Sequence, residues 1–165
     1  MATVTQVVES RSSGYQTIKV GVKVRNATSQ PMSLGFQVGS ASAVDNNGDG
    51  LKSNNDGVNG IGLVTGSRAD PQFVLKPGQE RTFSVGYYKG IYKGTIFGMS
   101  CSADFVLQQL ELLPSQQVRS VREYAISFAD RTANGSTAVS GAASSDNSAG
   151  QAAGKFVEGL FKKKK

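Results

Sequence analysis

The feature that most constrains this chain is the strict alternation of residues 15–26, YQTIKVGVKVRN. Aliphatic side chains occupy every second position from Ile18 to Val24, and the positions between them carry mostly polar or basic residues such as Lys19. Side chains of an extended strand point to opposite faces with a period of two. The segment is therefore predicted to be a strand with one buried face and one solvated face.

Shorter segments of the same kind follow between turn signals. The strands expected in this way are residues 3–9, 32–38, 72–76, 80–88 and 117–128, with a further strand or two within 95–113 and a short apolar segment at 61–64. Residues 105–113 (FVLQQLELL) also fit helical spacing, and we prefer a strand because the rest of the chain is β. Residues 45–60 are expected to be a polar loop. Short strands at this spacing predict an all-β chain, arranged as an antiparallel β-sandwich.

The composition excludes several kinds of catalytic site. The chain has no His and only one Cys among its 165 residues. A Ser-His-Asp triad, a His-ligated zinc site and an internal disulfide framework are therefore excluded. No sequence pattern nominates a pair of catalytic carboxylates. We expect that the protein is not an enzyme.

The composition changes after residue 132. Residues 133–154 consist mainly of Ala, Gly, Ser, Thr and Asn, and residues 162–165 are all Lys. Such a segment has little apolar surface to bury. We therefore expect a β-sandwich domain at residues 1–132 and a flexible Gly/Ser/Ala-rich linker with a short Lys-capped tail at residues 133–165.

The end of the tail is a candidate for membrane or partner contact. Its apolar residues fall on one side of a short helix and precede the Lys run, which suits an anionic membrane surface or a groove on a partner. The contact residues predicted are Phe156, Leu160, Phe161 and Lys162. The alternative is a frayed terminus that only adds solubility.

Three segments together carry a family resemblance. KVGVKVRNATSQPMSL (19–34), SAVDNNGDG (42–50) and FVLKPGQERTFSV (73–85) resemble the immunoglobulin-like, telokin-like domains of secreted bacterial proteins. The resemblance covers about residues 3–128. It implies an immunoglobulin-like sandwich outside the cytoplasm and no particular activity. The Cys…Trp…Cys core of antibody domains is missing, so that branch does not apply.

Residues 45–56 have the spacing of a twelve-residue calcium loop. The candidate ligands are Asp45, Asn47, Asp49, the carbonyl of Leu51, Ser53 and Asp56. Calcium prefers hard oxygens wrapped around a tight turn, which Gly50 would supply. Asp56 replaces the usual longer Glu, and no flanking helices are expected. The alternative is an ordinary inter-strand loop, in which Asn, Asp and Gly serve turn conformations. Calcium is the one cofactor expected.

Tyrosines and lysines alternate with glycines in residues 87–94, YYKGIYKG. Tyr88, Lys89, Tyr92 and Lys93 are the candidate ligand-binding residues, because aromatic stacking combined with positive charge suits sugars, phosphates or single-stranded nucleic acid. The alternative is a mobile hairpin tip whose aromatic residues have no ligand.

The charge and the N-terminus bear on partners and compartment. The net charge is +6, and much of it lies in the terminal Lys run, so the weakly basic body does not favour nucleic acid. No signal peptide is visible. We expect a periplasmic or secreted protein in its mature form, with a cytoplasmic one as the alternative.

The function expected is a non-catalytic extracytoplasmic β-sandwich that binds a protein or cell-surface partner and is stabilised by calcium. The alternative is a structural or assembly subunit, as an oligomer, a fibre or an envelope component, that uses its C-terminal arm for contacts.

Overall fold

The computed structural model describes residues 1–12, 14–66, 68–114, 117–132 and 137–138, and all regular structure within them is β. The strands are β1 (Ala2–Ser12), β2 (Tyr15–Arg25), β3 (Met32–Gln37), β4 (Ser42–Asp45), β5 (Gly50–Asn59), β6 (Gly62–Val64), β7 (Phe73–Leu75), β8 (Glu80–Gly90), β9 (Ser100–Leu112), β10 (Val118–Thr132) and β11 (Thr137–Ala138). The all-β prediction is confirmed.

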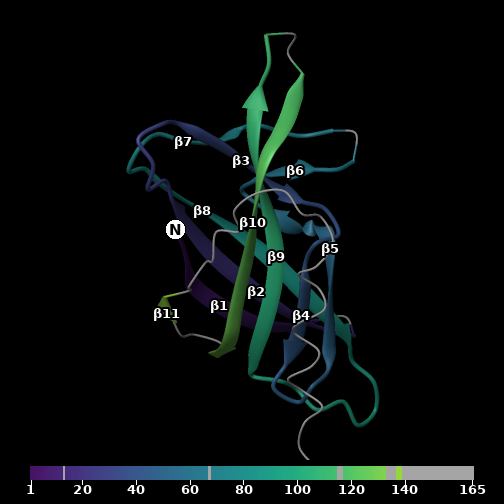
Figure 1. Cartoon of the computed structure of the whole chain (residues 1–165). Coiled ribbons are helices and arrows are strands. Elements are labelled where there is room, and N and C mark those ends of the chain that lie inside the picture. The colour runs from purple at the N-terminus through teal and green to yellow at the C-terminus, as the bar shows by residue number, and fades with distance from the viewer. Residues whose placement is uncertain (13, 67, 115–116, 133–136, 139–165) are drawn as a thin grey trace, which may run out of the picture.

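The strands form one hydrogen-bonded sheet in the order β11-β1-β2-β8-β5-β4-β9-β3-β6, with β10 on β9 and β7 on β3. The short β4–β5 hairpin joins a half built on β2 and β8 to a half built on β9 (Figure 1). The register of β2 on β8 is unbroken from Tyr15 opposite Gly90 to Arg25 opposite Glu80. This unbroken pair carries the alternation that the sequence shows most clearly.

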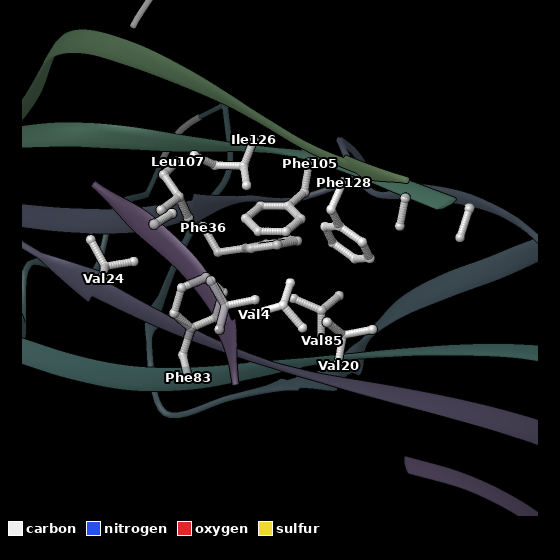
Figure 2. Packing of buried hydrophobic residues seen from close by; sticks show 14 of the residues in the cluster. Val4, Val20, Val24, Phe36, Phe83, Val85, Phe105, Leu107, Ile126 and Phe128 are labelled. Atoms are coloured by element: carbon white, nitrogen blue, oxygen red, sulfur yellow. The ribbon is translucent and has the colours of Figure 1, made fainter. Parts of the chain in front are cut away.

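The two halves of the sheet face each other across one hydrophobic core. Phe83 of β8 contacts Phe105 of β9 edge to face, with ring centroids 5.8 Å apart. Figure 2 shows Phe83, Val85 and Val20 pointing toward Phe105 and Phe128 across the interior. The even-numbered aliphatic residues of β2 are all buried, as the alternation predicts.

The sheet is not purely antiparallel, which corrects the expectation in one place. Gly35 to Gln37 of β3 pair in parallel with Gly62 to Val64 of β6. The β4–β5 hairpin lies between β3 and β6 in the chain. The chain reverses direction from β4 to β5 and turns again before β6, so β6 runs beside β3 in the same direction. Gly35 also has no room for a side chain, because a Cβ there would lie 2.4 Å from Val64 Cγ2.

The prediction of a polar loop over residues 45–60 was wrong. Only residues 46–49 form a turn, and Gly50–Asn59 are the strand β5. Lys52 and Ser53 pair with Tyr88 and Tyr87 of β8, and a register shift follows before Val58. The edge of β8 thus imposes a strand on residues whose own propensity favours turns.

Residues 105–113 are confirmed as strand up to Leu112, within β9. β9 pairs with β10 along its length, and the far end of this pair projects beyond β3 and β6 (Figure 1). Because β10 pairs only with β9 among the described strands, its outer edge is open.

The C-terminal prediction is mostly outside the described residues. Thr137 and Ala138 are described and pair with Val4 and Thr3 of β1. Phe156, Leu160, Phe161 and Lys162 lie outside the described part of the chain. No helix in the described ranges is long and apolar enough to cross a membrane.

Candidate functional site

An open hollow of about 850 Å³ gathers all four side chains predicted to bind a ligand. Its lining includes Tyr88 and Lys89 from the end of β8 and Tyr92 and Lys93 from the loop that follows. The start of β2 and the β4–β5 hairpin complete it, with Tyr15, Asn47, Asp49 and Lys52 among their contributions. We call this the tyrosine–lysine hollow.

Lys89 forms the polar floor of the hollow. Its Nζ donates hydrogen bonds to Asp45 Oδ2 at 2.5 Å, to Asp49 Oδ2 at 2.8 Å and to the carbonyl of Ile96 at 3.0 Å. The Asp45 side chain is 0% exposed and the Lys89 side chain 9% exposed, whereas Asp49 is half exposed. The Lys89 ammonium thus lies between two carboxylates, in a place largely screened from water.

The ionisation of this pair follows from its hydrogen bonds. Burial alone would raise the pKa of Asp45, but the bonds from Lys89 and from the backbone N–H groups of Asp49 and Asn47 hold it below its ordinary value. Burial alone would lower the pKa of Lys89, and the two carboxylates raise it instead. Both groups are therefore held in their charged forms.

The loop of residues 91–99 is held in place from several sides. Asn46 Oδ1 accepts hydrogen bonds from the backbone N–H of Met99 at 2.8 Å and of Ser100 at 3.2 Å. The buried side chain of Gln16 donates to the carbonyl of Gly98 at 2.9 Å. The Arg11 guanidinium lies 3.8 Å from the centre of the Phe97 ring. These contacts fix residues 97–100, directly after the part of the loop that lines the hollow.

Gly98 makes the close packing of this loop against the hairpin feasible. A Cβ at this position would lie 2.5 Å from both Cβ and Oδ2 of Asp45. Only glycine lets the loop backbone approach the buried carboxylate so closely.

The exposed rim combines aromatic rings with free ammonium groups. Tyr15 and Tyr88 meet edge to face at 5.9 Å, and Tyr92 is 79% exposed, with its ring over the backbone of Gly90. Lys52 and Lys93 form no ion pair with any described residue. The rim therefore offers stacking surfaces and positive charge that nothing in the described protein neutralises.

The residues proposed as calcium ligands are only partly brought together. Asp45 and Asp49 lie side by side on Lys89, and Asp45 Oδ1 also accepts the backbone N–H groups of Asn47 and Asp49. Leu51 lies in β5 with its side chain buried. Among the described residues, no group of three or more His, Cys, Asp or Glu side chains is placed to hold a metal.

The far end of the proposed calcium loop follows an extended path. Ser53 lies three residues beyond Gly50 along β5, which amounts to roughly 10 Å of strand. Asp56 lines a different hollow, beside Thr17 and Tyr88. Calcium stays a prediction, centred on Asp45 and Asp49.

The sequence missed several residues that shape the hollow. Tyr15 and Lys52 line the hollow and Asn46 bonds the loop, although all three lie far before residues 91–99 in the chain. Tyr15 and Lys52 each lie opposite the end of β8 in the sheet register, and a correct pairing of β2 and β5 with β8 would have found them.

Comparison with known proteins adds no relative. No family model, no curated protein and no solved structure matches this chain. The function is therefore inferred from the residues and their geometry.

Proposed function

We propose that this chain is a non-catalytic extracytoplasmic binding domain, with an immunoglobulin-like β-sandwich fold, that holds an acidic polysaccharide of a cell surface in its tyrosine–lysine hollow. The observation that carries the proposal is the convergence of Tyr88, Lys89, Tyr92 and Lys93 on one hollow. Two opposed halves of sheet around one core support the sandwich. The resemblance of residues 19–34, 42–50 and 73–85 to immunoglobulin-like domains of secreted bacterial proteins supports the immunoglobulin-like connectivity and a place outside the cytoplasm.

The chemistry of the rim favours an acidic sugar polymer. Tyr92 presents a broad, exposed ring, on which the apolar face of a sugar can stack. Lys52 and Lys93 supply free positive charge for carboxylates of uronic acids. Asp49 accepts hydrogen bonds from hydroxyl groups, which a sugar has in number.

The ionisable groups near the hollow support binding rather than catalysis. Lys89 stays protonated and Asp45 ionised, so neither is poised to exchange a proton near neutral pH. Burial, with a smaller contribution from the charge of Asp45, raises the pKa of the Cys101 thiol to about 11. Burial, with smaller contributions from Cys101 and Asp104, also raises the pKa of the Tyr87 hydroxyl. These groups stay in their neutral forms and are poor nucleophiles.

Titration calorimetry with polygalacturonate, and with dextran as the uncharged polymer, tests the proposal. We expect binding of polygalacturonate that weakens as salt is added and little binding of dextran, because the free lysines contribute through charge. Tyr92→Ala should weaken binding by about tenfold, as expected for loss of one stacking ring. Lys93→Gln should weaken it less and reduce its salt dependence.

Lys19→Gln is the matched control, because Lys19 is an exposed β2 lysine that does not line the hollow. Equal losses for Lys19→Gln and Lys93→Gln would show that the polymer follows net charge and not this hollow. Absence of polygalacturonate binding would reject the acidic polysaccharide as the ligand class.

A second candidate, an assembly subunit, is favoured by the projecting end of the β9–β10 pair. Leu112 is 63% exposed near its tip, and the outer edge of β10 is open within the described sheet (Figure 1). Open edges are templates for strand addition from another chain. Charged residues on β10, among them Arg119 and Glu123, oppose unspecific pairing of this edge.

Size-exclusion chromatography with light scattering distinguishes the two candidates. A stable oligomer that dissociates in Leu112→Lys, but not in the control Val74→Lys, would favour the assembly subunit. Val74 is a comparably exposed aliphatic residue on β7, away from the β9–β10 pair. A monomer at all concentrations would leave the binding domain as the better proposal.

A further inference from the structure

A second hollow lies at the opposite end of β2 from the tyrosine–lysine hollow. Tyr15 begins β2 and lines the first hollow, whereas Val24 and Arg25 end β2 and line the second. Eleven residues of extended strand separate the two by roughly 30 Å. The second hollow has a volume of about 240 Å³, and we call it the apolar hollow.

The apolar hollow continues the hydrophobic core between the two halves of the sheet. It is lined by buried side chains from β1, β2, β3, β9 and β10, namely Ala2, Val24, Leu34, Leu107 and Ile126. Figure 2 shows Val24 and Leu107 at one end of the core cluster. An occupant of this hollow would therefore touch inner-face residues of both halves and exclude water from them.

Two arginines are among the residues that line the apolar hollow, and of these Arg122 shares the β10 face of Tyr124 and Ile126, which line it too. Arg25 ends β2 and Arg122 lies near the start of β10. Neither guanidinium has a hydrogen bond or an ion pair with a described residue. The hollow therefore combines an apolar interior with uncompensated positive charge.

The hydroxyl groups that line the hollow are already used within the protein. Thr28 Oγ1 donates to Asn26 Oδ1 at 2.7 Å, and Tyr124 donates to Gln109 Oε1 at 2.8 Å. The uncommitted polar side chain on the face that lines the hollow is thus the Arg122 guanidinium. It suits a ligand with hydrogen-bond acceptors at one end and no polar group along its body. A peptide fits less well, because its backbone N–H groups would lack acceptors.

We propose that the apolar hollow binds a medium-chain fatty acid, with the acyl chain between the two halves of the sheet and the carboxylate at Arg122. A methylene group occupies roughly the volume of one liquid water, about 30 Å³. The 240 Å³ of the hollow then corresponds to a chain of about eight carbons. This site is separate from the tyrosine–lysine hollow and does not depend on the function proposed for it.

Calorimetric titration of the full chain with butanoate, hexanoate, octanoate and decanoate tests the acyl part of the proposal. Affinity should rise by about fourfold for each added methylene, the equivalent of about 0.8 kcal/mol, and level off near octanoate when the hollow is full. Affinity that keeps rising beyond decanoate at the same rate would mean binding to an open surface or to micelles, and would overturn the proposal.

Two variants and one control test the location. Ala27→Trp places a large side chain from an exposed loop position into the lining and should abolish octanoate binding without unfolding the protein. Arg122→Gln should weaken octanoate by about tenfold and leave 1-octanol unchanged, because only the carboxylate uses the guanidinium. Arg119→Gln, on the same strand but outside the hollow, should leave both ligands unchanged.

Each remaining outcome counts against the proposal. No saturable binding of octanoate at millimolar concentration would overturn it. So would octanoate binding that survives Ala27→Trp while thermal melts show the variant folded. If Arg122→Gln and Arg119→Gln weaken octanoate equally, the carboxylate is attracted by general surface charge and not by this site.

Discussion

The two hollows at the ends of β2 use charge in opposite ways. In the tyrosine–lysine hollow, the most buried charge, Asp45, is neutralised within the protein by Lys89. In the apolar hollow, Arg25 and Arg122 have no described partner. Charges that are paired inside a fold hold its parts together, whereas exposed charges without a partner contribute little to stability and are free for a ligand.

The two hollows also differ in whether their polar residues hold the fold in place or are available to a ligand. The loop of residues 91–99 owes its position to Lys89, Asn46 and Gln16, so changes at these residues should affect folding first and binding through it. The side chains of Arg25 and Arg122 form no hydrogen bond or ion pair with another element in the described part of the chain. Their removal should affect only a ligand.

The largest effect is expected for Lys89→Met. This change keeps most of the side-chain volume but leaves the fully buried Asp45 carboxylate without its cation. Breaking a buried pair from one side costs about 3–5 kcal/mol of unfolding free energy. Denaturant melts measure it, and Lys52→Met, at the exposed rim of the same hollow, should stay within about 0.5 kcal/mol of the wild type. Equal stability of both variants would show that the Lys89 pair does not hold the hollow together.

Calcium binding tests whether Lys89 occupies the place that a metal ion would take between Asp45 and Asp49. A calcium ion on Asp45 and Asp49 has to displace the Lys89 ammonium, so Lys89→Met should bind calcium more tightly than the wild type. Calcium that binds only the folded state would raise the free energy of unfolding by about 2.7 kcal/mol at a hundredfold excess over Kd. Thermal melts with calcium and with chelator measure it, and Asp49→Ala should remove the effect. Unchanged melts of both the wild type and Lys89→Met would reject calcium at this hairpin.

A smaller loss is expected for Gly98→Ala. The added methyl group would meet Asp45 at 2.5 Å, so the loop or the hairpin has to shift. Overpacking of this kind costs about 1–3 kcal/mol. Gly50→Ala is the control, because no atom lies within 4 Å of a Cβ at that position. Comparable melts for the two variants would mean that the loop moves away from the hairpin without cost.

The smallest effect is expected for the double change Arg25→Gln and Arg122→Gln. Surface substitutions that break no described contact alter stability by no more than about 0.5 kcal/mol. The same melts measure it in the absence of fatty acid. A loss close to that of Lys89→Met would show that the arginines have a structural role and would erase the contrast between the hollows.

Local alternation made the central strands predictable, and tertiary contacts made the rest unpredictable. β2 and β8 could be predicted because their inner residues alternate through the core. β5 could not, because Asn, Asp and Gly favour turns and only pairing with β8 makes residues 50–59 a strand. The four predicted tyrosines and lysines were found because they are neighbours in sequence, while Tyr15 and Lys52 join them only through strand register.

The apolar hollow left no separate signal in the sequence. Its lining residues, such as Leu34 and Ile126, follow the same alternation as residues that are packed on all sides. Whether the space between facing residues is filled depends on how the two halves of the sheet meet. The distance between the two halves of the sheet cannot be predicted from the residue pattern of a single strand.

The chemistry of Cys101 has a practical consequence for experiments on this protein. Its thiol is 1% exposed and its pKa is raised to about 11, so very little reactive thiolate is present at neutral pH. The variant Ile96→Cys, at an exposed position in the lining of the tyrosine–lysine hollow, should therefore accept a maleimide dye at one defined position, with the native thiol left in place. A change in the fluorescence of that label would report the binding of a ligand at the rim of the tyrosine–lysine hollow.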